Sequence, residues 1–204
     1  MSRALVLVDL QYDFCPGGAL AVAHGDETIA VARALMPKFD TVVATQDWHP
    51  PSHGSFAVNQ PGTQPYQLGE LAGLPQVMWP PHCVQGTRGA ELHEGLDRTR
   101  ITHVFAKGTD PAIDSYSGFF DNGKRKSTGM GEWLKAHGAT ELVVLGLATD
   151  YCVKATAIDA RELGFAVTLV EDGCRGVELA PGDTAKAIAA MRAAGVTIVQ
   201  SSAV

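Results

Sequence analysis

Short apolar runs that alternate with helical patterns constrain the fold of this chain more than any other feature. The runs are residues 3–8, 41–45, 103–106, 141–145, 166–171 and 196–199. Runs without polar alternation are typical of strands buried on both faces of a parallel sheet, in which each connection needs a crossover helix. We therefore predict an α/β fold with a doubly wound, mostly parallel six-stranded sheet and helices on both faces.

Four helices are expected between these strands. Asp26 is placed to cap the first, whose buried face is predicted to carry Ile29, Ala32, Met36 and Phe39. The others span residues 131–137, 150–164 and 183–194, and each ends at a glycine. Residues 50–90 and 109–126 show no sustained periodicity. Irregular stretches of that length are often functional in compact domains, so we expect both to contribute to a site.

Composition narrows the class of protein. A chain of 204 residues without a linker-like segment predicts a single domain over residues 1–204. A net charge of −6 argues against a nucleic-acid partner and favours small polar ligands. The first ten residues reach Asp9 too soon for a signal peptide or a membrane span, so we expect a cytoplasmic protein without a membrane partner. Four cysteines without paired spacing predict free thiols, and a homo-oligomer stays possible.

Three reactive side chains follow predicted strands. Asp9 follows the first strand, Lys107 follows the third, and Cys152 is expected in the first helical turn after the fourth. Ligands of open α/β sheets bind at the carboxyl ends of the strands, and a helix start favours a thiolate and a neighbouring oxyanion. Together the three could supply a base, a cation and a nucleophile. Each alone has an ordinary alternative: a turn-forming Asp, a solvated Lys or a structural buried Cys.

A second group of side chains has the composition of a metal site. Asp47 and His49 end the second strand and point the same way in extended backbone, while His53 and His82 lie in the irregular stretch that follows. Carboxylate and imidazole ligands suit zinc, iron or manganese. Prolines 50 and 51 exclude a helical pairing of His49 with His53. His53 could therefore be a ligand, a partner of a ligand or a plain loop residue.

With both groups assembled, the sequence resembles the nicotinamidase/pyrazinamidase group of the isochorismatase-like cysteine hydrolases. The resemblance runs nearly from end to end. It is carried by the segments Val-Asp-Leu-Gln-Tyr-Asp-Phe (8–14), Gln-Asp-Trp-His-Pro (46–50), Trp-Pro-Pro-His-Cys (79–83), Phe-Ala-Lys-Gly (105–108), Asp-Ser-Tyr-Ser (114–117) and Gly-Leu-Ala-Thr-Asp-Tyr-Cys-Val (146–153).

The resemblance implies a role for each site residue. It makes Asp9, Lys107 and Cys152 the catalytic triad, and Asp47, His49 and His82 the ligands of one divalent metal ion, zinc first, with iron or manganese as alternatives. The family varies its ligand at the place of His53, which is a further candidate. A cis peptide between residues 147 and 148 is expected to aim the N–H groups of Ala148 and Cys152 at the substrate oxygen. Phe14 and Trp79 are expected to flank a pyridine ring, with Tyr116 nearby.

The implied reaction is hydrolysis of nicotinamide, and of pyrazinamide, to the acid and ammonia through a cysteine thioester, as in NAD salvage. Three alternatives stay open at this point. An isochorismate-type hydrolase is expected to lack this cysteine and this metal set. A hydrolase that uses only metal-activated water would survive alkylation of Cys152, and a zinc-binding interaction module would release no ammonia.

Overall fold

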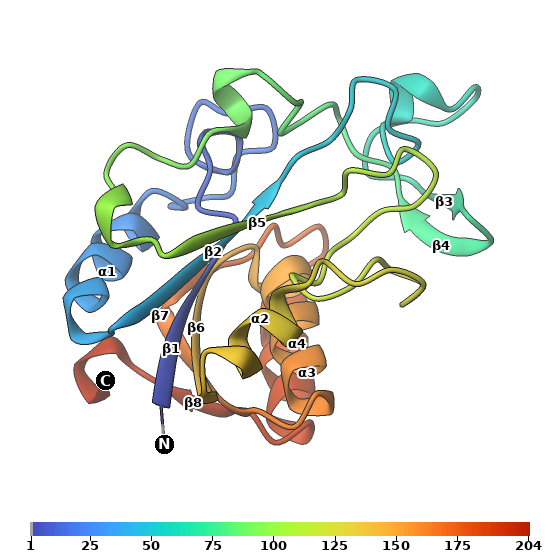
Figure 1. The fold of residues 1–204 in the computed structure, drawn as a ribbon. Helices are drawn as coiled ribbons and strands as arrows, with labels where there is room; N and C mark the ends of the chain where they lie inside the picture. The colour runs from blue at the N-terminus through green and yellow to red at the C-terminus, as the bar shows by residue number, and fades with distance from the viewer. Residues whose placement is uncertain (1) are drawn as a thin grey trace.

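The computed structural model describes residues 2–204 and contains a six-stranded sheet and a separate two-stranded sheet (Figure 1). In chain order the helices and strands are β1 (Ser2–Val8), α1 (Glu27–Leu35), β2 (Thr41–Asp47), β3 (Leu68–Leu71), β4 (Leu74–Val77), β5 (His103–Lys107), α2 (Met130–Ala136), β6 (Ala139–Leu147), α3 (Lys154–Glu162), β7 (Ala166–Arg175), α4 (Asp183–Ala193) and β8 (Thr197–Val199). A π-helical turn, Thr149–Val153, precedes α3.

The large sheet has the strand order β5-β2-β1-β6-β7-β8, and all of its pairings are parallel. The chain adds β2 and β5 on one side of β1 and then crosses to add β6, β7 and β8 on the other. The order therefore reverses between β1 and β6, where α/β sheets form their ligand crevice. Residues 4–8 of β1 and 142–145 of β6 are fully buried at the centre of the core.

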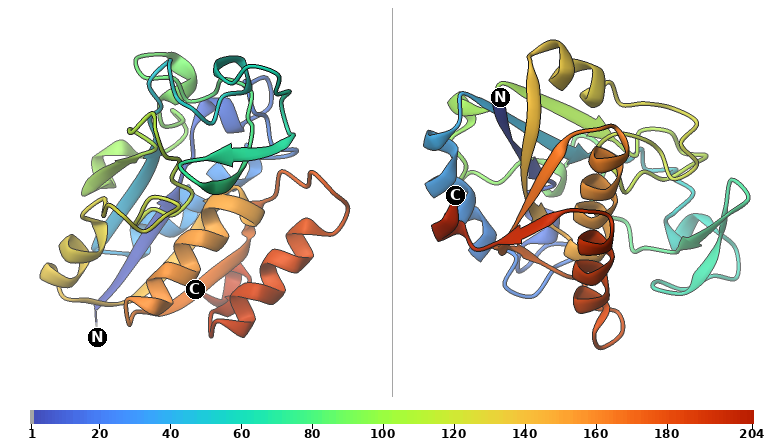
Figure 2. Two further views of the ribbon diagram at one scale, coloured as in Figure 1. Left: turned by 90° about the vertical axis from the view of Figure 1, so that its right-hand side faces the viewer. Right: turned by 90° about the horizontal axis from the view of Figure 1, so that it is seen from below.

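Helices cover both faces of this sheet, as predicted. α1 packs on β6 and β7 from one side, whereas α2, α3 and α4 cover the opposite face (Figure 2). The predicted burial of Ile29, Ala32, Met36 and Phe39 is confirmed, since each is at most 7% exposed. The predicted helix is too long, however, because α1 ends at Leu35, Met36 begins a 3₁₀ turn and Phe39 is extended. None of the helices within residues 2–204 combines the length and apolarity needed to span a bilayer.

Several boundaries differ from the sequence prediction. Asp26 precedes α1 but makes no capping hydrogen bond through its side chain, because its own backbone is already helical at φ −64° and ψ −25°. The fifth predicted strand continues four residues further, to Arg175. Its register against β6 is irregular there: Leu169 pairs with Val144, but Cys174 is the residue that pairs with Gly146. The extra residues of β7 bulge out of the ladder.

The largest omission is the β3-β4 hairpin, which lies in the stretch expected to be irregular and projects away from the main sheet (Figure 1). A two-residue turn joins its strands, with Ala72 at φ 56° and Gly73 at φ 78°. Positive φ at both positions is the type I′ geometry that suits a tight hairpin. The hairpin matters for the site because it carries Gln76, which is only 2% exposed.

Candidate active site

The structure brings the strand-end residues to the predicted crevice. Asp47 ends β2 and is the register partner of Lys107, which ends β5. Asp9 directly follows β1, and Cys152 lies in the turn that follows β6. These four side chains are at most 6% exposed. Chain topology thus places a thiol, an ammonium and two carboxylates in one buried cluster.

Lys107 is at the centre of this cluster. Its Nζ lies 2.9 Å from Asp9 Oδ2 and 3.4 Å from Cys152 Sγ, and it donates a hydrogen bond to Asp47 Oδ1. A further hydrogen bond of 3.0 Å reaches the Ser115 carbonyl. The Asp9 contact is an ion pair without hydrogen-bond geometry at Oδ2. Asp9 Oδ1 instead accepts a 2.6 Å hydrogen bond from the Thr45 hydroxyl, which fixes the carboxylate.

Cys152 lies in the π-helical turn rather than in the first turn of a regular α-helix. The Ala148 carbonyl accepts hydrogen bonds from the N–H groups of Tyr151 and Val153, each at 3.1 Å, and the second of these is the i→i−5 bond of a π-turn. The expected cis peptide between Leu147 and Ala148 is present. Just before it, a Cβ on Gly146 would lie 2.1 Å from the Val8 carbonyl oxygen, so only glycine fits where β6 enters this turn.

The electrostatics of the cluster correct one expectation. Burial raises the pKa of the Cys152 thiol well above its ordinary value; Lys107 opposes the shift, and Asp9 adds to it. The helix start alone therefore does not produce a thiolate in the resting protein. Burial also raises the pKa of Asp9, to about 6, although Lys107 lowers it. A neutral thiol beside an ionised Asp9 is the expected resting state near pH 7.

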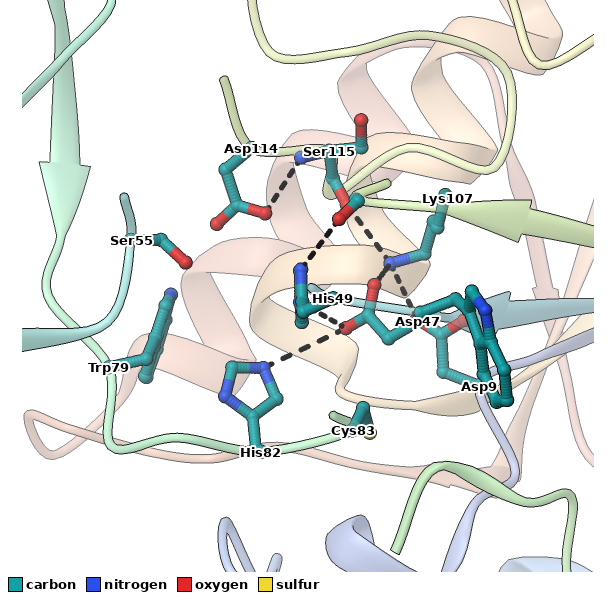
Figure 3. A network of polar contacts seen from close by, with 12 residues as sticks. Asp9, Asp47, His49, Ser55, Trp79, His82, Cys83, Lys107, Asp114 and Ser115 are labelled. Atoms are coloured by element: carbon teal, nitrogen blue, oxygen red, sulfur yellow. Dashed lines mark hydrogen bonds and ion pairs between the residues drawn. The ribbon is translucent and has the colours of Figure 1, made fainter. Parts of the chain in front are cut away.

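Asp47, His49 and His82 form the predicted metal set (Figure 3). Asp47 Oδ2 lies 3.6 Å from His49 Nε2 and 3.8 Å from His82 Nε2. The other ring nitrogens contact backbone carbonyls: His49 Nδ1 lies 2.9 Å from the Gly108 oxygen, and His82 Nδ1 lies 2.8 Å from the Pro80 oxygen. In the neutral ring, donation from Nδ1 to a carbonyl leaves Nε2 unprotonated toward the carboxylate, as metal ligation requires.

The protonation states of His82 and Asp47 agree with this donor set, whereas that of His49 depends on metal binding. Burial lowers the pKa of His82 to about 4, so its ring is neutral near pH 7. Burial disfavours the charged form of Asp47, but Lys107 and His49 outweigh it and hold the pKa of this carboxyl well below its usual range. Burial lowers the pKa of His49, but Asp47 outweighs burial and raises this pKa above its ordinary value, so a metal would have to displace a proton from that ring. Two imidazoles and one carboxylate within 4.8 Å of one another then fit a divalent transition metal.

Asp47 also connects the two groups that the sequence analysis treated separately. Its Oδ1 accepts the hydrogen bond from Lys107, whereas its Oδ2 faces the two histidines (Figure 3). One carboxylate thus has a lysine on one side and a candidate metal position on the other. The register of β2 against β5 produces this arrangement, because it sets Asp47 directly beside Lys107.

His53 is fully buried but is not in the same trio. Its Nδ1 lies 2.7 Å from the Ser55 hydroxyl oxygen, and its Nε2 has no hydrogen-bond partner among residues 2–204. Its donor atom groups instead with those of His49 and Asp114, all within 4.8 Å of one another. The sequence analysis quoted Asp114 only as part of a motif and gave it no role.

A cavity opens over Cys152 and the histidines. It is lined by the expected Phe14, Trp79, Tyr116, Ala148 and Cys152, by Asp47, His49 and His82, and also by Leu20, Asp114, Tyr151 and Val177. The last four were not predicted. Of these, only Asp114 and Tyr151 lie in motifs that could have indicated them, since Leu20 and Val177 are ordinary apolar loop residues. The Trp79 and Tyr151 rings of the lining pack edge to face, with their centroids 4.9 Å apart.

Asp150 ties one wall of this cavity to the turn that carries Cys152. The side chain is 4% exposed, and its two oxygens accept hydrogen bonds from the backbone N–H groups of Val177 at 2.9 Å and Glu178 at 2.8 Å. Val177 lines the cavity from the loop after β7. A single carboxylate therefore fixes the wall residue relative to the reactive thiol two positions along the chain.

Comparison with known proteins gives a consistent result. A model of the isochorismatase domain matches residues 3–203. A nicotinamidase of Escherichia coli is 54% identical over 200 residues, which cover 96% of this chain and 93% of that protein. A solved structure of an Acinetobacter nicotinamidase/pyrazinamidase superposes with a TM-score of 0.96 at 44% identity, covering 99% and 97% of the two chains. A pyrazinamidase of Pyrococcus horikoshii, solved in complex with zinc, superposes with a TM-score of 0.80 at 36% identity, covering 98% and 99%.

Proposed function

The chain belongs to the isochorismatase family, and from this membership and the site we infer that it is a metal-dependent cysteine amidohydrolase with nicotinamidase activity. It converts nicotinamide, and pyrazinamide, to the carboxylic acid and ammonia, a reaction of NAD salvage. The observation that carries the mechanism is the contact of Lys107 Nζ with Asp9, Asp47 and the Cys152 sulfur in one buried cluster.

In this proposal Cys152 is the nucleophile and Asp9 is its base. As the sulfur attacks the carboxamide carbon, its proton passes to Asp9, and Lys107 stabilises the negative charge that remains on the pair. The N–H groups of Ala148 and Cys152 hydrogen-bond to the oxyanion of the tetrahedral intermediate. Asp9 then returns the proton to the departing nitrogen, which leaves as ammonia, and a thioester remains.

Water completes the cycle. Asp9 accepts a proton from a water molecule, whose oxygen attacks the thioester carbon, and the acid and the neutral thiol are released. The raised pKa of Asp9, about 6, suits a group that both accepts and donates a proton near neutral pH.

The metal set has a positioning role in this proposal. A divalent ion, with zinc as our first choice, would be held by Asp47, His49 and His82 and would bind the ring nitrogen of the substrate. Phe14 and Trp79 would enclose the ring and Tyr116 would close one side of the slot; all three line the cavity. Holding the ring at a distance from the reacting carbon orients the amide over the sulfur.

The test is ammonia release from nicotinamide by the purified protein. The Cys152→Ala variant should lose turnover and still fold, while Cys15→Ala and Cys174→Ala should keep substantial activity, because both thiols are buried outside the cavity lining. Substantial turnover by Cys152→Ala would refute the thioester route. No ammonia from the parent protein would refute the activity itself.

We also propose a cytoplasmic location and nicotinamide as the small-molecule partner. All four cysteines are unpaired, as predicted from their spacing, which fits a reducing compartment.

A further inference from the structure

The carboxylate proposed as the base is held by a hydroxyl of the neighbouring strand. Thr45 of β2 and Asp9, directly after β1, are both fully buried. The parallel ladder pairs Leu7 with Ala44, and β1 then leaves the sheet at Asp9, whose backbone is left-handed at φ 49°. The Asp9 N–H donates to the Thr45 hydroxyl oxygen at 3.2 Å, and the same hydroxyl donates to Asp9 Oδ1 at 2.6 Å. Thr45 thus contacts both the backbone and the carboxylate of Asp9.

These two hydrogen bonds fix the direction of the Thr45 hydroxyl proton. A hydroxyl has one proton to donate and two lone pairs that accept. The Asp9 N–H can only donate, so it occupies a lone pair of the hydroxyl, and an ionised carboxylate can only accept, so Oδ1 takes the proton. Without this contact the carboxylate would be poorly oriented, because the last torsion of an aspartate side chain is broad and two-fold.

The second oxygen of Asp9 is left open. Oδ2 is buried and has no hydrogen-bond partner among residues 2–204. Lys107 Nζ lies 2.9 Å from Oδ2 and 3.4 Å from the Cys152 sulfur, so this oxygen shares the ammonium with the thiol (Figure 3). A carboxylate oxygen of Asp9 and the Cys152 sulfur also lie within 4.8 Å of each other. Of the two oxygens, Oδ2 is therefore the one with a free lone pair on the side of Lys107 and the thiol.

We propose that Thr45 is a positioning residue that directs the proton transfers of the reaction to Asp9 Oδ2, an inference that rests on the proposed function. As the Cys152 sulfur bonds to the carboxamide carbon, its S–H bond breaks, the proton moves to Oδ2, and the carbonyl electron pair moves to the carbonyl oxygen. When the oxyanion re-forms the carbonyl, Oδ2 gives the proton to the amide nitrogen and the C–N bond breaks, which releases ammonia. In the protonated acid Oδ1 is the carbonyl oxygen and still accepts from Thr45, so one oxygen both takes the proton and returns it.

Thr45→Val tests this inference because it keeps the branched shape of the side chain and removes the hydroxyl. The variant should lower kcat for nicotinamide on the order of 10–100-fold, because misplacement of a catalytic group has a cost of that size. KM should change little, because Thr45 does not line the cavity. Thr45→Ser restores the hydroxyl and should recover most of kcat. Zinc affinity, measured by titration against a competing chelator, should match that of the parent in both variants.

Thr28→Val is the matched control. Thr28 of α1 is also fully buried, and its hydroxyl donates a hydrogen bond of the same length, 2.6 Å, to the Gly25 carbonyl. It does not line the cavity either. The control variant should unfold at a lower urea concentration than the parent but keep the parent's kcat. The comparison separates the loss of a buried hydrogen bond from the loss of catalytic positioning.

A kcat of Thr45→Val equal to that of the parent would overturn the inference. A loss of kcat that Thr45→Ser does not recover, or that comes with weaker zinc binding, would overturn it as well, since Thr45 would then act through the strand. If Thr45→Val does not fold, Thr45→Ala and Thr28→Ala take the place of the two valine variants under the same criteria. No ammonia from the parent would refute the proposed function, whereas an active parent with an equally active Thr45→Val refutes this inference alone.

Discussion

Gly108 contacts the ring of the proposed ligand His49. Replacement of Gly108 by alanine is therefore a direct structural test of the metal set. The residue has φ +64°, and its carbonyl accepts the hydrogen bond from His49 Nδ1. A Cβ built on it would lie 2.3 Å from Cε1 and 2.6 Å from Nδ1 of the His49 ring. The substitution therefore acts both on the backbone and on a proposed ligand.

The two effects have different magnitudes and can be separated. A left-handed backbone costs a non-glycine residue about 1–2 kcal/mol of folding free energy. Ordinary contact begins at 3.4 Å, so relieving a 2.3 Å approach requires the ring to move by 1.1 Å, the difference between these distances. Metal ligands tolerate displacements of only about 0.2 Å, and His49 is 1% exposed with no room to rotate away. We therefore expect at least a 10–100-fold loss of zinc affinity.

Gly138→Ala is the control for the backbone effect. Gly138 has φ +75°, and a Cβ there meets nothing within 4 Å. Urea unfolding of the two metal-free variants should show a loss of about 1–2 kcal/mol for Gly138→Ala and a larger loss for Gly108→Ala. Zinc titration should show normal affinity for Gly138→Ala. If Gly108→Ala were no less stable than Gly138→Ala and bound zinc like the parent, the contact with His49 would not constrain the site and this reasoning would be refuted.

Two further predictions concern the substrate. Benzamide presents the same amide and ring without the ring nitrogen, so chelation of the metal should reduce kcat/KM for nicotinamide far more than for benzamide, each tenfold loss corresponding to about 1.4 kcal/mol; equal reductions would show that the metal does not act through the nitrogen. Asp150→Asn leaves one of the Val177 and Glu178 N–H groups without an acceptor, which is expected to lower the free energy of unfolding by about 1–3 kcal/mol. It should raise KM more than it lowers kcat, because the cavity wall at Val177 is displaced while Cys152 is retained. A fall in kcat at constant KM would assign Asp150 to the chemistry instead.

Much of this site could be predicted because its residues follow buried strands. Apolar runs fixed the order of the strands along the chain, and the carboxyl ends of parallel strands meet at one edge, so Asp9, Asp47 and Lys107 were expected to converge. Periodicity predicted the buried residues Ile29 and Ala32 of α1, because burial of an apolar stripe is the main source of helix stability, but it did not show where the helix ends.

What sequence reasoning missed depends on contacts between distant segments. The β3-β4 hairpin has mostly half-exposed or exposed side chains and an Ala-Gly turn, so neither alternation nor an Asn-Gly signal marks it. The shared role of Asp47 follows from the register of β2 against β5, which single-sequence patterns do not specify. Asp114 acquires its environment from Gln76, 38 residues away in the chain.

The burial of β1 and β6 determines how the site can come apart. Residues 4–8 and 142–145 are fully shielded from solvent, so their amide hydrogens exchange only when the whole sheet opens. Asp9 and the Cys152 turn directly follow these two strands and have no local route to disorder. The β3-β4 hairpin pairs with no strand of the main sheet and is tied to the 109–126 stretch by side-chain hydrogen bonds of Gln76 and Arg125. The floor of the crevice should thus persist until global unfolding, whereas amide hydrogens of the hairpin, which lies outside the main sheet, should exchange earlier.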